Sequence, residues 1–166
     1  ALTSFDGAAR RPLRHDEHDL PVGNVMFIDD DGQQPTEIAA TLDAVRQGWQ
    51  DRRVEVVFKP HRYSRTRDLL DDFAEVLAGA DRLIVTEVYP AGEDPIAGAD
   101  GRAICAAVRA RGKVEPVFVK NLDDIPKALP ALLQNNDVLL TLGAGSIGAV
   151  APTLSGVLKK GGSGNR

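Results

Sequence analysis

The sequence predicts a doubly wound α/β fold, with a mostly parallel sheet covered by helices on both faces. Two observations lead to this prediction. From residue 24 onward, short β-branched segments alternate with segments of helical periodicity. Most of the predicted strands are also too continuously apolar for a sheet with one solvated face, and burial on both faces is typical of parallel sheets. Because crossovers between parallel strands are right-handed, these units should build a Rossmann-like sheet.

The first predicted strand, taken in chain order, is an edge strand near the N-terminus. The segment GAARRPLRH at 7–15 has the composition of an added edge strand, antiparallel to its neighbour, whereas HDEHDLPVG at 15–23 resembles a polar connection. The strands that follow are expected at 24–29, 53–59, 81–88, 115–120 and 137–142.

Two amphipathic helices are predicted in the first half of the chain. One spans 36–49, with Thr36 as its expected cap. Its apolar stripe consists of Ile38, Leu42, Val45 and Trp49. The other, at 66–80, should end at Gly79. Its inward side chains are Leu69, Phe73, Val76 and Leu77.

Three further helices are predicted after these. One around 100–112 should stop at Gly112. The next, around 122–136, contains Pro126 and Pro130, which fit a first turn or a kink better than a helix interior. A last helix is expected at 147–159. The final residues, KKGGSGNR, have linker composition, so we expect one domain over 1–158 and a flexible tail over 159–166.

Composition excludes several classes of protein. With 43% hydrophobic and 27% charged residues, the chain has the balance of an ordinary soluble domain. No stretch approaches the roughly 20 apolar residues of a membrane helix, and the N-terminus lacks the order of a signal peptide, so we expect a cytoplasmic protein without membrane contact. A net charge of -4 and a pI near 5.4 argue against a nucleic-acid partner.

The single cysteine and the three histidines predict no metal centre. Cys105 lies in the apolar run AICAAV and is expected to be core packing. Three histidines and one cysteine are too few soft ligands for a structural zinc site.

Two glycine-containing loops are candidates for ligand binding. GAGSIG at 143–148 satisfies G-x-G-x-x-G but follows the last strand and has no later acid for a ribose, so we favour a tight turn. IDDDGQQPTE at 28–37 leaves a strand with three carboxylates and two amides. Two interpretations stay open there, a site for sugar hydroxyls or a metal and a solvated turn that caps a helix.

A basic segment, KPHRYSRTRD at 59–68, is the third candidate. The guanidinium groups of Arg62 and Arg65 suit a carboxylate or phosphate. Arg67 precedes Asp68 and is expected to form an ordinary surface ion pair. The long loop EVYPAGEDPIAGADG at 87–101 follows another strand and is expected to line the same crevice.

These segments, in this order, resemble the C-terminal domain of the Mur ligase family. The resemblance covers roughly residues 2–155 and rests on long motifs. They are FDGAARR at 5–11, DD-x-G-x-x-PTEIAATL at 29–42, FKPHRYSRTRDL at 58–69, TEVYPAGEDPI at 86–96, ADGRA at 99–103 and LTLGAGSIG at 140–148. HRYSRTRD and VYPAGEDPI are specific, unlike GAGSIG.

The resemblance implies part of an ATP-dependent ligase that joins L-alanine to UDP-N-acetylmuramate in peptidoglycan synthesis. Members of that family have an N-terminal domain for the UDP sugar and a central ATPase domain that binds most of the ATP and Mg. This chain is similar only to the third domain, so we expect both others to be missing and the fragment alone to be inactive. The lack of a G-x-x-x-x-G-K-[ST] motif independently indicates that the ATPase domain is missing.

Matching positions assign the site residues. Arg62 and Arg65 would bind the alanine carboxylate, with His61 and Tyr63 supporting their loop, and Asp30 would reach the ribose of the nucleotide. Where the family has D-Y-G-H-H-P, this chain has an aspartate and two glutamines. The nucleotide loop therefore consists of Asp30, Asp31, Gln33 and Gln34.

That departure leaves alternatives open. Asp31 removes an aromatic face and adds negative charge near phosphates, and glutamine cannot titrate near neutrality. A free-standing, non-catalytic binding module derived from a Mur ligase is one alternative. The related murein peptide ligase, which attaches a peptide rather than alanine, is the other.

Overall fold

The structure is a computed structural model that describes residues 13–143. Its six-stranded sheet has the order β1-β2-β6-β3-β4-β5. The strands are β1 (Arg14–Leu20), β2 (Gly23–Asp30), β3 (Val54–Phe58), β4 (Arg82–Val85), β5 (Pro116–Phe118) and β6 (Val138–Leu142). β1 is antiparallel to β2, and all other pairings are parallel. The predicted fold class, including one antiparallel edge strand, is confirmed.

The edge strand lies later in the chain than predicted. RHDEHDL, most of which we had assigned to a polar connection, forms β1. A strand with one solvated face tolerates charged side chains, and these also discourage pairing with a second chain. Its histidines pack on aromatic rings, with His15 at 5.2 Å from Trp49 and His18 at 4.4 Å from Phe27 between ring centroids.

The helices are α2 (Pro35–Gly48), α3 (Tyr63–Asp68), α4 (Leu70–Leu77), α5 (Gly101–Ala110) and α6 (Ile125–Ala128). The helix predicted from residue 66 begins earlier and is interrupted at Leu69, which separates α3 from α4. Pro126 and Pro130 each lie in a first turn, as predicted, and reduce the fourth helical segment to short pieces. The predicted last helix, nearly all of GAGSIG and the tail lie outside the described residues.

The start of α2 also differs from the prediction. Its N-cap is Gln34, not Thr36, because Pro35 occupies the first helical position. The Glu37 carboxylate accepts hydrogen bonds from the backbone N–H groups of Gln33 and Gln34 at 2.9 and 3.0 Å. This reciprocal cap fixes the loop that precedes the helix.

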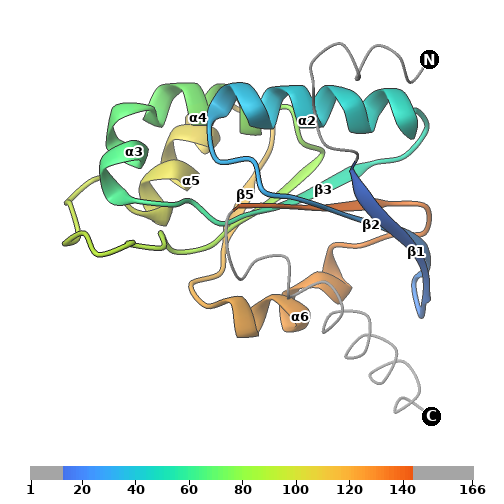
Figure 1. Cartoon of the computed structure of the whole chain (residues 1–166). Helices are drawn as coiled ribbons and strands as arrows, with labels where there is room; N and C mark the ends of the chain where they lie inside the picture. The colour runs from blue at the N-terminus through green and yellow to red at the C-terminus, as the bar shows by residue number, and fades with distance from the viewer. Residues whose placement is uncertain (1–12, 144–166) are drawn as a thin grey trace.

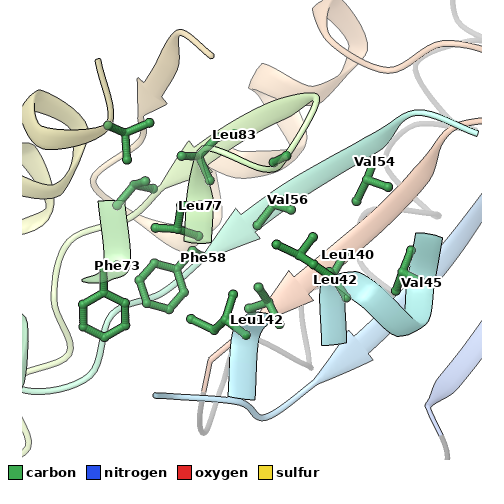
Figure 2. Packing of buried hydrophobic residues seen from close by; sticks show 14 of the residues in the cluster. Leu42, Val45, Val54, Val56, Phe58, Phe73, Leu77, Leu83, Leu140 and Leu142 are labelled. Carbon is green, nitrogen blue, oxygen red and sulfur yellow. The ribbon is translucent and has the colours of Figure 1, made fainter. Parts of the chain in front are cut away.

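Apolar cores lie on both faces of the sheet. α2, α4 and α5 cover one face, and α6 covers the other (Figure 1). In Figure 2, Leu42 and Val45 of α2 lie over Val54, Val56 and Leu140 of the sheet. Cys105 is buried in this core, as predicted, and burial raises the pKa of its thiol to about 11.

Glu55 is a buried carboxylate in the middle of β3. Its side chain is completely buried, and neither oxygen has a hydrogen-bond partner among the described residues. Glu55 stands in register with Leu139 and Arg82. Burial, partly offset by the charge of Arg82, raises its pKa to about 8.

The parallel strands end along one line across the sheet. Asp30, Leu142, Phe58, Val85 and Phe118 are neighbours in register from β2 to β5. The loops that follow β2, β3 and β4 therefore leave the same edge, which is where open α/β sheets bind ligands.

Candidate functional site

The loop after β2 is shaped by its own aspartates. Asp30 Oδ2 accepts hydrogen bonds from Gly32 N and from Thr41 Oγ1 of α2, both at 3.0 Å. A Cβ atom at Gly32 would lie 2.9 Å from that same oxygen, so a larger residue would displace the Asp30 carboxylate. Asp29 accepts a hydrogen bond from Thr141 Oγ1 at 2.8 Å. Asp30 is thus held in one orientation at the sheet edge, half-buried, while Asp31 is exposed.

The loop after β3 contains a strained backbone at Arg62. Its φ of 75° and ψ of 130° are unusual for a residue with a side chain, and such conformations cost roughly 1 to 3 kcal/mol. Arg62 N donates to Tyr89 O at 2.8 Å, and Tyr89 N donates to Pro60 O at 2.9 Å. The Arg62 carbonyl accepts from both N and Oγ1 of Thr66. The surrounding chain therefore enforces this conformation.

The loop after β4 provides the acid that faces Arg62. Arg62 Nη2 lies 3.3 Å from Glu93 Oε2, and Glu93 also accepts hydrogen bonds from Ser64. The 87–101 loop thus contacts the arginine loop through Glu93, while its place in a shared crevice stays a prediction. Glu93 itself was missed in the sequence, where its only signal was an acid in a glycine- and proline-rich loop.

Arg65 connects the basic segment to the loop after β2. Arg65 Nη1 donates a hydrogen bond to Gln33 Oε1. Side chains expected to bind the amino acid and the nucleotide are therefore direct neighbours. Arg67 forms the predicted exposed ion pair, with Nε 2.9 Å from Asp68 Oδ1.

His61 and Tyr63 are packed rather than solvated. His61 Nδ1 is buried and has no hydrogen-bond partner in the described part of the chain. Burial lowers the pKa of His61, as do the charges of Arg65, Arg62 and Lys59, so its neutral form is favoured. Tyr63 is buried, and burial raises its pKa. Both positions fit the supporting role that we expected of them.

Tyr89 is the large hydrophobic side chain that stands out on the described surface, with 48% of it exposed. Its ring lies 5.1 Å from the His61 ring between centroids, and Lys59 Nζ lies 5.3 Å from its centroid. No local pattern in the sequence predicts a role for Tyr89. The cation and the stacked ring hold Tyr89 beside Arg62.

Glu87 and Gly101 close the long loop after β4 onto α5. Glu87 Oε1 accepts hydrogen bonds from the backbone N–H groups of Val88 and Gly101, each at 2.8 Å. A Cβ atom at Gly101 would lie 2.4 Å from the Thr86 carbonyl oxygen, so only glycine fits. Asp100 caps α5 by accepting from Ala103 N at 2.9 Å. The loop that presents Glu93 is thus fixed at its far end.

These loops place two guanidinium groups, a half-buried carboxylate and an amide along one sheet edge. Guanidinium groups suit carboxylates or phosphates, and carboxylate and amide groups suit sugar hydroxyls. Among residues 13–143 no group of three possible metal ligands is found, and no helix there is long and apolar enough to cross a membrane.

Comparison with known proteins identifies relatives of this arrangement. The model of the family described as Mur ligase, glutamate ligase domain, matches residues 17–145. A UDP-N-acetylmuramate–L-alanine ligase of Halorhodospira halophila is 52% identical over 162 residues, which are 98% of this chain and 33% of that protein. The chain therefore spans about a third of that relative.

Solved structures show the same fold. A UDP-N-acetylmuramate-alanine ligase from Thermotoga maritima matches with a TM-score of 0.72 and 26% identity, over 96% of this chain and 36% of that one. A murein peptide ligase from Psychrobacter arcticus matches with a TM-score of 0.66 and 22% identity, over 85% of this chain and 28% of that one. At that identity, the second likeness concerns the fold alone.

Proposed function

Because the chain belongs to the Mur ligase family as its C-terminal glutamate ligase domain, we propose that it is the amino-acid-binding, lid-like part of an ATP-dependent ligase. The reaction would join L-alanine to UDP-N-acetylmuramate in peptidoglycan synthesis, in the cytoplasm. One observation carries this proposal. Arg62 and Arg65 lie on the loop and helix that follow β3, and Arg65 donates a hydrogen bond to Gln33 of the proposed nucleotide loop. They do so in a chain that is 52% identical to a UDP-N-acetylmuramate–L-alanine ligase.

In this proposal the arginines bind and orient the incoming amino acid. Arg62 and Arg65 engage its carboxylate, which turns the neutral amine toward the activated muramoyl carboxyl group. Neutral His61 and buried Tyr63 keep the arginine loop rigid. Fixing a nucleophile in this way removes much of the entropic cost of the reaction.

The nucleotide side is formed by the loop after β2. Asp30 is preset by Gly32 and Thr41, so its carboxylate can accept hydrogen bonds from ribose hydroxyls without reorganising. Asp31, Gln33 and Gln34 complete this loop. When bound, ATP with Mg supplies the phosphoryl group that activates the muramoyl carboxylate.

The experiment that tests this function uses the full-length protein that carries this domain. ADP release should require both L-alanine and UDP-N-acetylmuramate, and the 166-residue chain alone should release none. The murein peptide ligase alternative would be established if ADP release depended on a tripeptide as the amine substrate instead of on alanine. A full-length protein with no amino-acid-dependent ADP release would support the non-catalytic module.

A further inference from the structure

The carboxylate of Glu93 joins the strained Arg62 to the first turn of α3. Glu93 Oε2 accepts hydrogen bonds from Arg62 Nε and Nη2, both at 3.3 Å, and from Ser64 Oγ at 2.5 Å. Glu93 Oε1 accepts from the backbone N–H of Ser64 at 3.0 Å. Arg62 Nη2 also donates to Ser64 Oγ at 3.3 Å. The three side chains form a closed triangle.

The triangle leaves the Nη1 atom of the Arg62 guanidinium group available. Glu93 approaches Arg62 from the side, on Nε and Nη2. Within residues 13–143, Nη1 of Arg62 donates no hydrogen bond, and 46% of the side chain is exposed. Nη1 carries two N–H donors, and guanidinium N–H groups donate well to a carboxylate. Arg62 can therefore hold Glu93 and bind a second carboxylate.

The backbone and the side chain of Arg62 are both held by the loop after β4. Tyr89 O accepts from the Arg62 backbone N–H at 2.8 Å, and Glu93 holds the guanidinium group. The hydrogen bonds from Ser64 and Arg62 lower the pKa of Glu93 to about 2, so it carries its negative charge at all working pH values. Because both its backbone and its guanidinium group are held, the Arg62 side chain has one defined direction.

An ordinary surface ion pair, such as that of Arg67 with Asp68, lacks the additional hydrogen bonds that hold Glu93 and Arg62. Arg67 and Asp68 are adjacent in the chain and both more than half exposed, and their only hydrogen bond within the described residues joins them to each other. Glu93 instead lies 31 residues from Arg62 and accepts from three donor groups besides the Arg62 Nε atom. The arrangement fixes geometry across two loops.

We propose that Glu93 is a positioning residue for amino-acid binding, holding the Arg62 guanidinium side-on so that its Nη1 atom faces the carboxylate of the incoming amino acid. This inference rests on the proposed function, because it requires Arg62 to bind that carboxylate. Glu93 itself does not touch the amino acid. Its loss should therefore act through Arg62 alone.

The test compares Glu93→Gln with Asp94→Asn in the full-length protein. Asp94 is the exposed neighbour in the same loop, so its variant matches the loss of charge. Glu93→Gln keeps an acceptor for the Ser64 amide but loses the ion pair with Arg62. It should raise KM for alanine about tenfold, while kcat and KM for ATP stay within about twofold, as expected for uniform binding. Asp94→Asn should change none of the three.

A double-mutant cycle with Arg62→Ala separates positioning from any other role. If Glu93 acts through Arg62, adding Glu93→Gln to Arg62→Ala should leave KM for alanine unchanged within about twofold. The inference would be overturned if the two substitutions raised KM for alanine by factors that multiply in the double variant. It would also be overturned if Glu93→Gln left KM for alanine unchanged, as Asp94→Asn should. If Glu93→Gln proves unfolded in thermal melts, Ser64→Ala replaces it, and its KM for alanine should rise at least about threefold.

Failure of the inference can be distinguished from failure of the proposed function. A wild-type protein without alanine-dependent ADP release would overturn the function, whatever the variants do. A wild-type protein with that activity, combined with an unchanged KM for alanine in the folded Glu93 or Ser64 variant, would overturn only the role of Glu93.

Discussion

Arg62, Arg65 and Arg67 lie within six residues of one another, yet their surroundings differ. Arg62 and Arg65 face the loops after β4 and β2, and Arg67 pairs with its exposed neighbour. In the full-length protein, Arg62→Ala or Arg65→Ala should lower kcat/KM for alanine about tenfold or more, because each removes a charge-assisted hydrogen bond. Arg67→Ala should lower it less than about twofold. Steady-state kinetics with varied alanine measure all three.

Equal losses for the three arginines would contradict this assignment. Losses confined to KM for ATP would instead assign the basic segment to the nucleotide. Arg67 thus serves as the matched control, since it has the same side chain and lies in the same helix as Arg65.

Glu55 should make the stability of the domain depend on pH. Its pKa rises from an ordinary 4.5 to about 8 on folding, so the folded state binds a proton that the unfolded state releases. The free energy of unfolding should therefore fall as pH rises from about 4.5 to about 8 and then level off. Glu55→Gln should remove this fall and stabilise the chain at pH 8 by more than about 1 kcal/mol.

Urea unfolding of both proteins at pH 5 and pH 8 measures the effect. Glu75→Gln, an exposed glutamate on α4, is the control and should follow the wild type at both pH values. A wild-type protein that is equally stable at pH 5 and pH 8 would show that Glu55 does not retain its proton.

At the scale of the elements, a hydrogen bond between side chains joins α2 to the end of β2. The Thr41 hydroxyl donates to Asp30 Oδ2 from a buried position. Thr41→Val keeps the shape but removes the donor, so it should destabilise the chain by about 1 kcal/mol in urea unfolding. Thr36→Val, exposed on the same helix, should change stability by less than about 0.5 kcal/mol. Similar effects of the two substitutions would mean that the hydrogen bond contributes little.

The elements show what sequence patterns can and cannot predict. The buried strands and α5 were predicted because apolar runs and a terminal glycine are local signals. β1 was misplaced because its partner, not its own composition, makes RHDEHDL a strand. The start of α3 was missed because the unusual backbone of Arg62 is held by a hydrogen bond to Tyr89, 27 residues along the chain, which no local pattern signals.

The candidate site was predictable to a similar extent. Residues that follow strands could be placed at the sheet edge from the sequence, and Arg67 could be set aside because its partner is adjacent. Glu93, Tyr89 and Thr41 could not, because their roles depend on contacts between loops that are distant in the chain. No local pattern reports such contacts.

At the scale of the whole molecule, cores on both faces share one continuous sheet. Thermal or denaturant unfolding of this chain should therefore be a single cooperative transition. Circular dichroism and tryptophan fluorescence, which reports Trp49 near β1, should give the same midpoint. Separate midpoints would show that the edge formed by β1 unfolds on its own.

The absence of a P-loop motif from the sequence predicts weak nucleotide binding by this chain alone. Calorimetry with ATP and Mg should show no binding tighter than roughly micromolar, which corresponds to about 8 kcal/mol. Tighter binding would mean that this domain holds a strong phosphate site of its own and would contradict the prediction.

The position of β6 sets the order in which the sheet can be completed. β6 is the last strand of the described chain, yet it lies between β2 and β3, which pair with it and not with each other. As the chain leaves the ribosome, β2 and β3 each keep one edge without a hydrogen-bonded neighbour until residues 138–142 emerge. Co-translational folding of this sheet is therefore delayed to the end of its synthesis, and a nascent chain arrested before β6 should remain sensitive to protease.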